Sequence, residues 1–107
     1  MKYSVYLTEK AEEDLNAIAD YLINILLAGE NALKQIDRIE QAVMSLEEMP
    51  ERCHIYNNAL WNDKNLRVMR VDNYLVFYTT DSNNKMVTII RIMYGKRNIE
   101  WLLSQEE

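Results

Sequence analysis

Three strand-like runs dominate the last third of the chain, from Leu66 to Leu103, and short polar turns separate them. Arginines stand inside these runs instead of at their ends. An ionised guanidinium on a sheet loses hydration unless an anion or solvent meets it. The pattern therefore predicts hairpin-linked strands that build a surface for an anion, whether a phosphate or a carboxylate.

The composition predicts one small domain, residues 1–107, with room for a single core. Hydrophobic residues make up 49% of the chain and charged residues 27%, and two glycines and one proline leave little room for long loops. Cys53 is the only cysteine, which fits a reducing cytoplasm. The first ten residues lack an apolar signal region, and Leu22–Ala28 is too short to span a membrane. We therefore expect a cytoplasmic protein without a membrane partner.

The net charge of -5 conceals an asymmetry along the chain. Residues 1–50 carry four basic and ten acidic side chains, a balance of -6. Residues 64–98 carry seven basic and two acidic side chains, a balance of +5. Charges beyond a Debye length of ~8–10 Å are largely screened, so a ligand near the basic half would respond to that half alone.

The first half of the chain predicts a strand followed by two helices. Lys2–Leu7 alternates apolar and polar residues, and Thr8 suits a helix N-cap because acidic residues follow it. Gly29 is expected to end the first helix in the left-handed conformation. A second helix runs from about Asn31 to Glu48 and stops at Pro50. The short connection predicts an antiparallel helical hairpin.

The second half predicts a loop over residues 51–65 and then three strands, at about Leu66–Val71, Tyr74–Thr80 and Met86–Tyr94. A closing helix is expected over Arg97–Ser104. The order β-α-α-β-β-β-α gives an α+β fold, a mostly antiparallel sheet packed against the N-terminal helical hairpin.

Turn lengths predict how these strands pair. A two-residue turn at Asp72-Asn73 sets Arg67 opposite Tyr78, and a four-residue turn at Asp81–Asn84 sets Thr80 opposite Lys85 and Tyr74 opposite Arg91. One face then carries Arg67, Met69, Val76, Tyr78, Ile89 and Arg91. The other face, which is richer in apolar residues, carries Val68, Arg70, Leu75, Phe77, Ile90 and Ile92. The two arginines of the first face are expected to lie open to an acidic ligand.

The chain carries several short segments in a fixed order: Ala11-Glu12-Glu13-Asp14-Leu15, Leu66-Arg67, Asn73-Tyr74 with the apolar strand that follows, Arg91, and Tyr94-Gly95-Lys96-Arg97-Asn98. Together they resemble the RelE/ParE superfamily, the toxins of bacterial type II toxin–antitoxin modules. Tyr94 stands where the family commonly has His, and Asn98 where it commonly has Asp. The resemblance covers almost the whole chain and implies a RelE/ParE-like fold.

The resemblance implies a toxin that arrests growth when free and is neutralised by a cognate antitoxin wrapped around it. RelE-like members cleave mRNA on the ribosome, whereas ParE-like members poison DNA gyrase without being nucleases. The acidic charge, the long helical hairpin and the helix after Tyr94 favour the ParE-like branch. A RelE-like ribonuclease and a degenerate member that only binds its antitoxin remain alternatives. The resemblance implies no cofactor.

Candidate site residues follow from the same resemblance. For RNA cleavage, Arg67 and Arg91 would hold the phosphate and Tyr94 would serve as acid or base. A tyrosine with a reference pKa near ~10 is a poor general base, which weakens this reading. Target or antitoxin binding would use Arg67, Arg70, Tyr78, Arg91, Lys96 and Arg97. The structural alternatives for Arg67 and Arg91 are pairing with Asp or Glu of the helices and closing the sheet edge. Those for Arg70, on the more apolar face, are an ion pair and an edge position. His54 lacks further ligands at metal-binding spacing, so no metal site is predicted.

Overall fold

The structure is a computed structural model, which describes residues 2–25, 27, 29–56 and 65–95. Its helices and strands are β1 (Ser4–Leu7), α1 (Glu9–Asp20), a π-helix (Tyr21–Ile25), α2 (Glu30–Met44), two short 3-10 helices (Ser45–Glu47 and Pro50–Arg52), β2 (Arg67–Val71), β3 (Tyr74–Asp81) and β4 (Met86–Tyr94). This order confirms the predicted α+β architecture. The predicted closing helix, Arg97–Ser104, lies outside the described residues.

Thr8 begins α1 as its N-cap, as predicted. Its hydroxyl accepts a hydrogen bond of 3.1 Å from the Ala11 N–H, which satisfies one of the free donors of the first turn. Glu9 and Glu12 complement the positive end of the helix dipole. These local preferences fix where the chain leaves β1 and turns back across the sheet.

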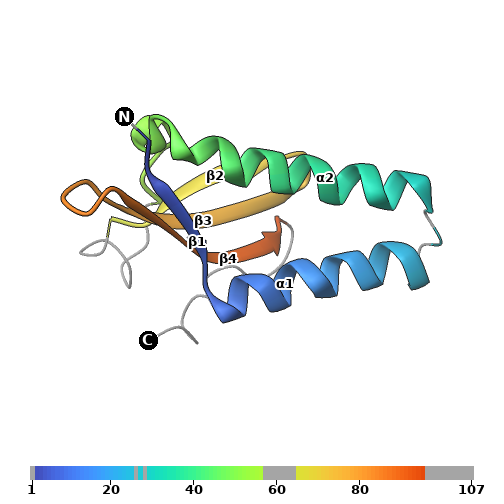
Figure 1. The fold of residues 1–107 in the computed structure, drawn as a ribbon. Coiled ribbons are helices and arrows are strands. Elements are labelled where there is room, and N and C mark those ends of the chain that lie inside the picture. The colour runs from blue at the N-terminus through green and yellow to red at the C-terminus, as the bar shows by residue number, and fades with distance from the viewer. Residues whose placement is uncertain (1, 26, 28, 57–64, 96–107) are drawn as a thin grey trace.

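The two helices form an antiparallel hairpin that lies on one face of the sheet, and its far end projects beyond the strands (Figure 1). Gly29 has the expected positive φ, 53°, but it is the N-cap of α2 and not the C-terminal residue of α1. Instead, α1 continues into the π-helix at Tyr21. The second helix is shorter than predicted, since it tightens into 3-10 geometry after Met44.

The four strands lie in the order β1-β4-β3-β2. β1 runs parallel to β4, and the other neighbours are antiparallel. The predicted pairing of β2 with β3 is confirmed, with Arg67 opposite Tyr78. Asp72 has a φ of 56° in the two-residue turn, a conformation that aspartate tolerates better than most residues.

The predicted pairing of β3 with β4 is wrong. Thr80 lies opposite Val87 and not Lys85, because β3 extends through Asp81, whose carboxylate accepts the N–H groups of the turn behind it. A bulge shifts the register further, since Tyr78 pairs with Ile89 and Phe77 with Arg91, which leaves Ile90 as the extra residue. Tyr74 consequently lies opposite Tyr94 and not Arg91.

The sheet buries apolar side chains on both faces. The larger cluster joins the sheet to the helices and contains Ala11, Ile39, Val43, Leu46, Met69, Tyr74, Val76, Tyr78, Val87, Ile89 and Ile92. A smaller cluster on the other face contains Leu66, Phe77 and Met93. The helix-covered face is therefore the one that was predicted to carry open arginines. The bulge moves Ile92 onto it, and each fully buried Ile or Leu contributes roughly 1.5–3 kcal/mol.

None of the helices in the described residues has the length and apolar character that a membrane span requires.

Candidate functional site

The edge of β4 is covered by two different means. β1 pairs with β4 only as far as Leu7 opposite Ile89. Beyond that point, side chains at the start of α1 form hydrogen bonds to the backbone of β4. The Thr8 hydroxyl donates to the Ile90 carbonyl at 3.0 Å, and the Asp14 carboxylate accepts the Ile92 N–H at 3.0 Å. Helix side chains thus satisfy the backbone groups that a longer β1 would have paired.

Asp14 also holds the guanidinium of Arg91. Nε of Arg91 donates to Oδ2 of Asp14 at 2.6 Å, and a second guanidinium nitrogen donates to Oδ1 at 2.8 Å. The two side chains are only 15% and 10% exposed, respectively. A bidentate, charge-assisted pair of this kind is strong only while both partners are present, because removing either one leaves the other buried without its bidentate counter-ion.

The expectation of two open guanidinium groups on one face of the sheet is therefore wrong. Arg91 is buried at 8% exposure and bound to an internal carboxylate. The bulge at Ile90 places it opposite Phe77, whereas Arg67 lies opposite Tyr78 on the helix-covered face. Of the two structural alternatives for these arginines, pairing with a helix carboxylate is the one realised for Arg91.

Arg67 is engaged by backbone carbonyls. One of its guanidinium nitrogens donates to the Cys53 carbonyl at 2.7 Å and to the Glu51 carbonyl at 3.1 Å. Its Nε is buried and has no hydrogen-bond partner among the described residues. Arg67 thus fastens the segment after the second 3-10 helix to the edge strand β2, where Ile55 also forms a bridge to Arg67.

Tyr78 is fully buried, so its side chain is not accessible to a target or an antitoxin in this conformation. Its hydroxyl donates to the Pro50 carbonyl at 2.7 Å. Burial is the main reason that the pKa of Tyr78 is raised, with the neighbouring Cys53 adding to the effect. The hydroxyl therefore stays protonated and anchors the same segment that Arg67 holds.

Arg70 and Tyr94, the remaining predicted residues that the structure describes, lie on different strands. Arg70 is exposed on the edge strand β2, in agreement with its predicted edge position, and makes no ion pair within the described residues. Tyr94 is 38% exposed at the end of β4. Lys96 and Arg97 lie outside the described residues.

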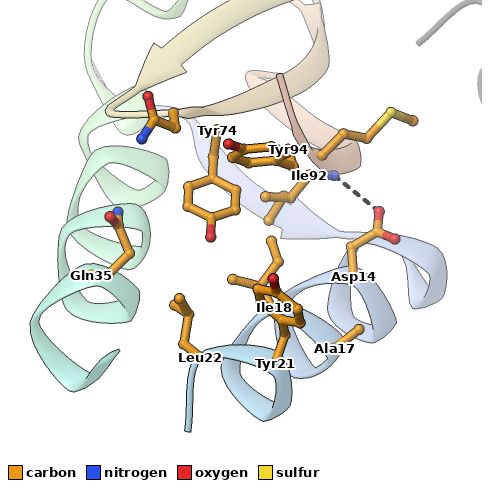
Figure 2. Close-up of a pocket in the computed structure, with 11 residues that line it drawn as sticks. Asp14, Ala17, Ile18, Tyr21, Leu22, Gln35, Tyr74, Ile92 and Tyr94 are labelled. Atoms are coloured by element: carbon orange, nitrogen blue, oxygen red, sulfur yellow. Dashed lines mark hydrogen bonds between the residues drawn. The ribbon is translucent and has the colours of Figure 1, made fainter. Parts of the chain in front are cut away.

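A pocket of about 530 Å³ opens between the helical hairpin and the ends of β3 and β4 (Figure 2). Ile18, Tyr21 and Leu22 line it from the first helix and its π-helical continuation. Tyr74 points into it from the sheet, next to Tyr94. The two tyrosine rings meet edge to face with their centroids 5.7 Å apart. The full lining is Asp14, Ala17, Ile18, Tyr21, Leu22, Gln35, Asn73, Tyr74, Ile92, Met93 and Tyr94.

The pocket combines apolar walls with tyrosine hydroxyls. Burial raises the pKa of Tyr74, and the nearby hydroxyls of Tyr94 and Tyr21 raise it further. The Tyr74 hydroxyl therefore remains a neutral donor and acceptor at physiological pH. Apolar walls with a few polar groups are typical of a site that takes an apolar anchor from a partner.

The turn between β2 and β3 is tied to α2 beside this pocket. Arg38 donates to the Asp72 carboxylate at 2.8 Å, and Gln35, which lines the pocket, donates to the same oxygen at 2.9 Å. Arg38 is the main cause of the lowered pKa of Asp72, followed by Gln35. Gly95 donates its N–H to the Asn73 carbonyl at 2.8 Å and so joins the end of β4 to the same turn.

The family of the chain follows from comparison with known sequences. The family model described as the ParE toxin of the type II toxin–antitoxin system parDE matches residues 5–99. The chain belongs to this family. It is thus a toxin of a type II toxin–antitoxin system, which confirms the predicted resemblance to the RelE/ParE superfamily. No curated protein sequence matches the chain significantly.

Solved structures of toxins share the fold of this ParE-family chain. The chromosomal ParDE system of P. aeruginosa aligns with a TM-score of 0.70 at 23% identity, over 87% of this chain and 96% of that one. The complex RelBE2 from Mycobacterium tuberculosis aligns at 0.61 and 20% identity, over 88% and 92%. A free mutant of the E. coli toxin RelE aligns at 0.64 and 12% identity, over the full length of both chains.

Two residues of the ParE-family site escaped prediction. Asp14 falls three residues after Ala11 and four before Ile18, so it occupies a position of the apolar stripe of α1. An acidic residue in such a stripe signals a buried partner, and Arg91 is the strand arginine that supplies it. Tyr21 continues the same stripe one turn beyond Ile18, which identifies it as a residue facing the sheet side of the hairpin.

Within the described residues of this ParE-family chain, no group of three or more His, Cys, Asp or Glu side chains could hold a metal ion. The groups that converge are apolar side chains, tyrosine hydroxyls and one internally neutralised carboxylate. Such an arrangement can bind a side chain or a helix of a partner.

Proposed function

We propose that this toxin arrests growth by binding a protein target, DNA gyrase, in the manner of the ParE-like branch, and that a cognate antitoxin neutralises it. On this proposal the chain acts by contact and does not cleave RNA.

The state of Arg91 is the observation that carries the proposal. RNA cleavage needs accessible cations at the scissile phosphate together with an acid and a base. The Arg91 guanidinium is instead held by Asp14 at 2.6 and 2.8 Å, and the residue is 8% exposed. To reach a phosphate, the guanidinium would have to abandon a buried carboxylate, which is costly.

The other groups that cleavage would require lie in separate environments. Arg67 donates to the carbonyls of Glu51 and Cys53 beside β2. Tyr94 packs against Tyr74 at the rim of the pocket. In the described residues these groups lie on separate surfaces and do not form a catalytic cluster. This favours action through a protein contact.

On the same proposal, the antitoxin inserts an apolar side chain into the pocket between hairpin and sheet. A volume of about 530 Å³ lies within the ~300–1,000 Å³ of typical binding pockets. Ile18 and Leu22 offer apolar walls, while the hydroxyl of Tyr74 offers a hydrogen bond to the backbone or flank of the anchoring segment.

Induced expression without an antitoxin tests the target. We expect viable counts to fall and gyrase-linked DNA breaks to accumulate, while a defined message in a translating extract stays intact. New 5′ ends in that message, with intact DNA, would instead identify a ribosome-dependent ribonuclease. Normal growth together with a tight antitoxin complex would identify a member that has lost its toxicity.

A pocket-filling variant tests the antitoxin site. Ala17→Phe adds a ring to the pocket lining, and Asn16→Phe adds the same ring to the neighbouring exposed position of α1 outside the lining. We expect Ala17→Phe to remain toxic but to need at least about tenfold more antitoxin, the protein encoded by the adjacent reading frame, for rescue. Asn16→Phe is expected to behave as the wild type. Equal rescue of both variants would contradict the assignment of the pocket.

A further inference from the structure

We propose that the far end of the helical hairpin binds the cellular target of the toxin. The target is a protein, and its binding surface is a neutral, apolar groove. The inference rests on the proposed function, since it presumes a target. We call this surface the hairpin tip, and it comprises Tyr21, Ile23, Ile25, Leu27 and Leu33.

Exposure of large apolar side chains is concentrated at the hairpin tip. Leu27 is 80% exposed, Ile25 67% and Leu33 65%, and Tyr21 and Ile23 are also exposed. Their elements lie at the end of the hairpin that projects past the sheet, so the larger core cannot cover them (Figure 1). Exposed apolar groups gathered in this way mark an interaction surface.

The backbone of the hairpin tip is irregular in two places. α1 widens into a π-helix over Tyr21–Ile25, a geometry that is frequent at functional sites. Leu27 has a φ of 51°, in the left-handed region that a leucine adopts only at a cost. Met49 adopts the same conformation elsewhere on the protein, so the π-helix and the clustering of exposed apolar residues are what distinguish the hairpin tip.

The chemistry of the partner follows from charge. The run from Tyr21 to Ala28 contains no ionisable group other than a tyrosine hydroxyl. Nucleic acid is bound mainly through cations that neutralise phosphates. Over residues 21–34 the one basic side chain is Lys34 and the one acidic side chain is Glu30, so the hairpin tip offers no excess of positive charge. A protein groove without net charge is the complementary surface.

The size of the hairpin tip distinguishes a target from a second copy of the chain. The hairpin tip consists of five exposed side chains, whereas a standard interface takes ~20–30 residues from each partner. A stable dimer of standard size needs ~800 Å² from each partner. The hairpin tip suits one component of a transient contact better than a homodimer.

The hairpin tip and the pocket can be separated by mutation. Ile25, Leu27 and Leu33 do not line the pocket, whereas Tyr21 belongs to both surfaces. An antitoxin seated in the pocket would thus lie directly beside the target-binding surface, which explains how its binding would block the target.

A matched pair of double variants tests the inference. Leu27 and Met49 are both large, exposed (80% and 75%) and left-handed (φ 51° and 49°). Asparagine tolerates that conformation well, so Leu27→Asn and Met49→Asn should relieve strain equally. Ile25→Ser is matched by Met44→Ser, since Met44 is an exposed apolar residue elsewhere on the hairpin.

We expect Ile25→Ser/Leu27→Asn to raise the toxin level needed for half-maximal growth inhibition at least about tenfold. Met44→Ser/Met49→Asn should stay within about twofold of the wild type. Circular dichroism and rescue by the adjacent-frame antitoxin establish that both variants are folded. Growth inhibition is the readout because it does not depend on which protein is the target.

Undiminished toxicity of the hairpin-tip variant would overturn the inference. A hairpin-tip variant that stays toxic but resists the antitoxin would overturn it by assigning the surface to the antitoxin. Sedimentation of the wild type as a dimer that the variant dissolves would overturn it in favour of self-association. A wild-type chain without toxicity would refute the proposed function itself.

Discussion

Removal of the Asp14 carboxylate is the sharpest test of how the β4 edge is held. In Asp14→Ala, the Arg91 guanidinium loses two hydrogen bonds, of 2.6 and 2.8 Å, and the Ile92 N–H loses its acceptor at 3.0 Å. Both partners of the ion pair are at most 15% exposed, so water cannot readily replace the carboxylate. Breaking a buried pair by removing one partner costs about 3–5 kcal/mol.

The unfolding free energy of the whole domain sets the scale of that loss. A small domain has ~5–15 kcal/mol of stability, so a loss of about 3 kcal/mol is at least a fifth of it. For a domain of this size, each kcal/mol shifts the melting temperature by roughly 4–8 °C. We therefore expect Asp14→Ala to melt about 12 °C or more below the wild type.

Urea unfolding followed by circular dichroism measures the change in free energy, and two further variants locate its origin. Asp20→Ala removes an exposed carboxylate of α1 that makes no ion pair within the described residues, and should cost less than about 0.5 kcal/mol. Asp14→Ala combined with Arg91→Met removes both charges, so it should be less destabilised than Asp14→Ala alone.

A loss below about 1 kcal/mol in Asp14→Ala would refute the reasoning. It would mean that the Arg91 guanidinium finds another partner or solvent at little cost. In that case the buried state of Arg91 could no longer argue against a phosphate-binding role.

Three further predictions concern the anchoring of the loop, the hairpin turn and the partner. Tyr78→Phe removes the buried hydrogen bond to the Pro50 carbonyl and should cost about 1–3 kcal/mol in urea unfolding, whereas an unchanged midpoint would contradict it. Arg38 holds the pKa of Asp72 below 3.8, so the stability from this contact is complete above that pH and is lost as the pH falls through the lowered pKa. The melting temperatures of the wild type and Asp72→Asn should therefore differ at pH 6, and the difference should narrow as the pH falls below 3.8, whereas a constant difference would be inconsistent with the contact. Binding of the toxin to purified gyrase, measured by interferometry, should weaken less than tenfold between 50 and 200 mM salt, since a protein making six to ten phosphate contacts would lose ~10³–10⁵ in affinity.

The parts of the fold that the sequence predicts depend on local rules. A threonine before acidic residues specifies an N-cap, and Thr8 forms one. A two-residue Asp-Asn turn specifies the register of the strands on either side, and Arg67 pairs with Tyr78 as a result. Each of these features is determined within a few residues of the chain.

The parts that the sequence does not predict depend on distant contacts. The extra residue at Ile90 is accommodated because the Thr8 hydroxyl reaches its carbonyl after β1 ends at Leu7. The residues next to Ile90 in the sequence carry no information about where β1 ends. One such bulge reverses the faces of all later residues of β4, so Arg91 leaves the predicted face, and its guanidinium binds Asp14, whose carboxylate also accepts the Ile92 N–H at the edge of β4.

The candidate site shows the same division. The sequence identifies the strand arginines as unusual. Whether each guanidinium faces solvent or a carboxylate depends on the register of the strands. The pocket combines Ile18 and Leu22 with Tyr74, and these residues meet only after the hairpin has packed on the sheet. The position of Asp14 in the apolar stripe of α1 was the one sequence signal of the true arrangement.

The contacts made by described basic residues of the second half explain why their positive charge does not create an anion-binding surface. Arg91 is neutralised by Asp14, Arg67 donates to backbone carbonyls, and Lys85 lies 5.1 Å from the centroid of the Tyr3 ring. Meanwhile the carboxylates of Glu9, Glu12, Glu13 and Asp20 are exposed on α1. A phosphate approaching the described part of the molecule would meet dispersed cations beside an acidic helix. Phosphate binding draws on clustered cations or converging backbone N–H groups, whereas burial of apolar area does not depend on charge, so the pocket and the hairpin tip are the surfaces of the described residues that suit recognition.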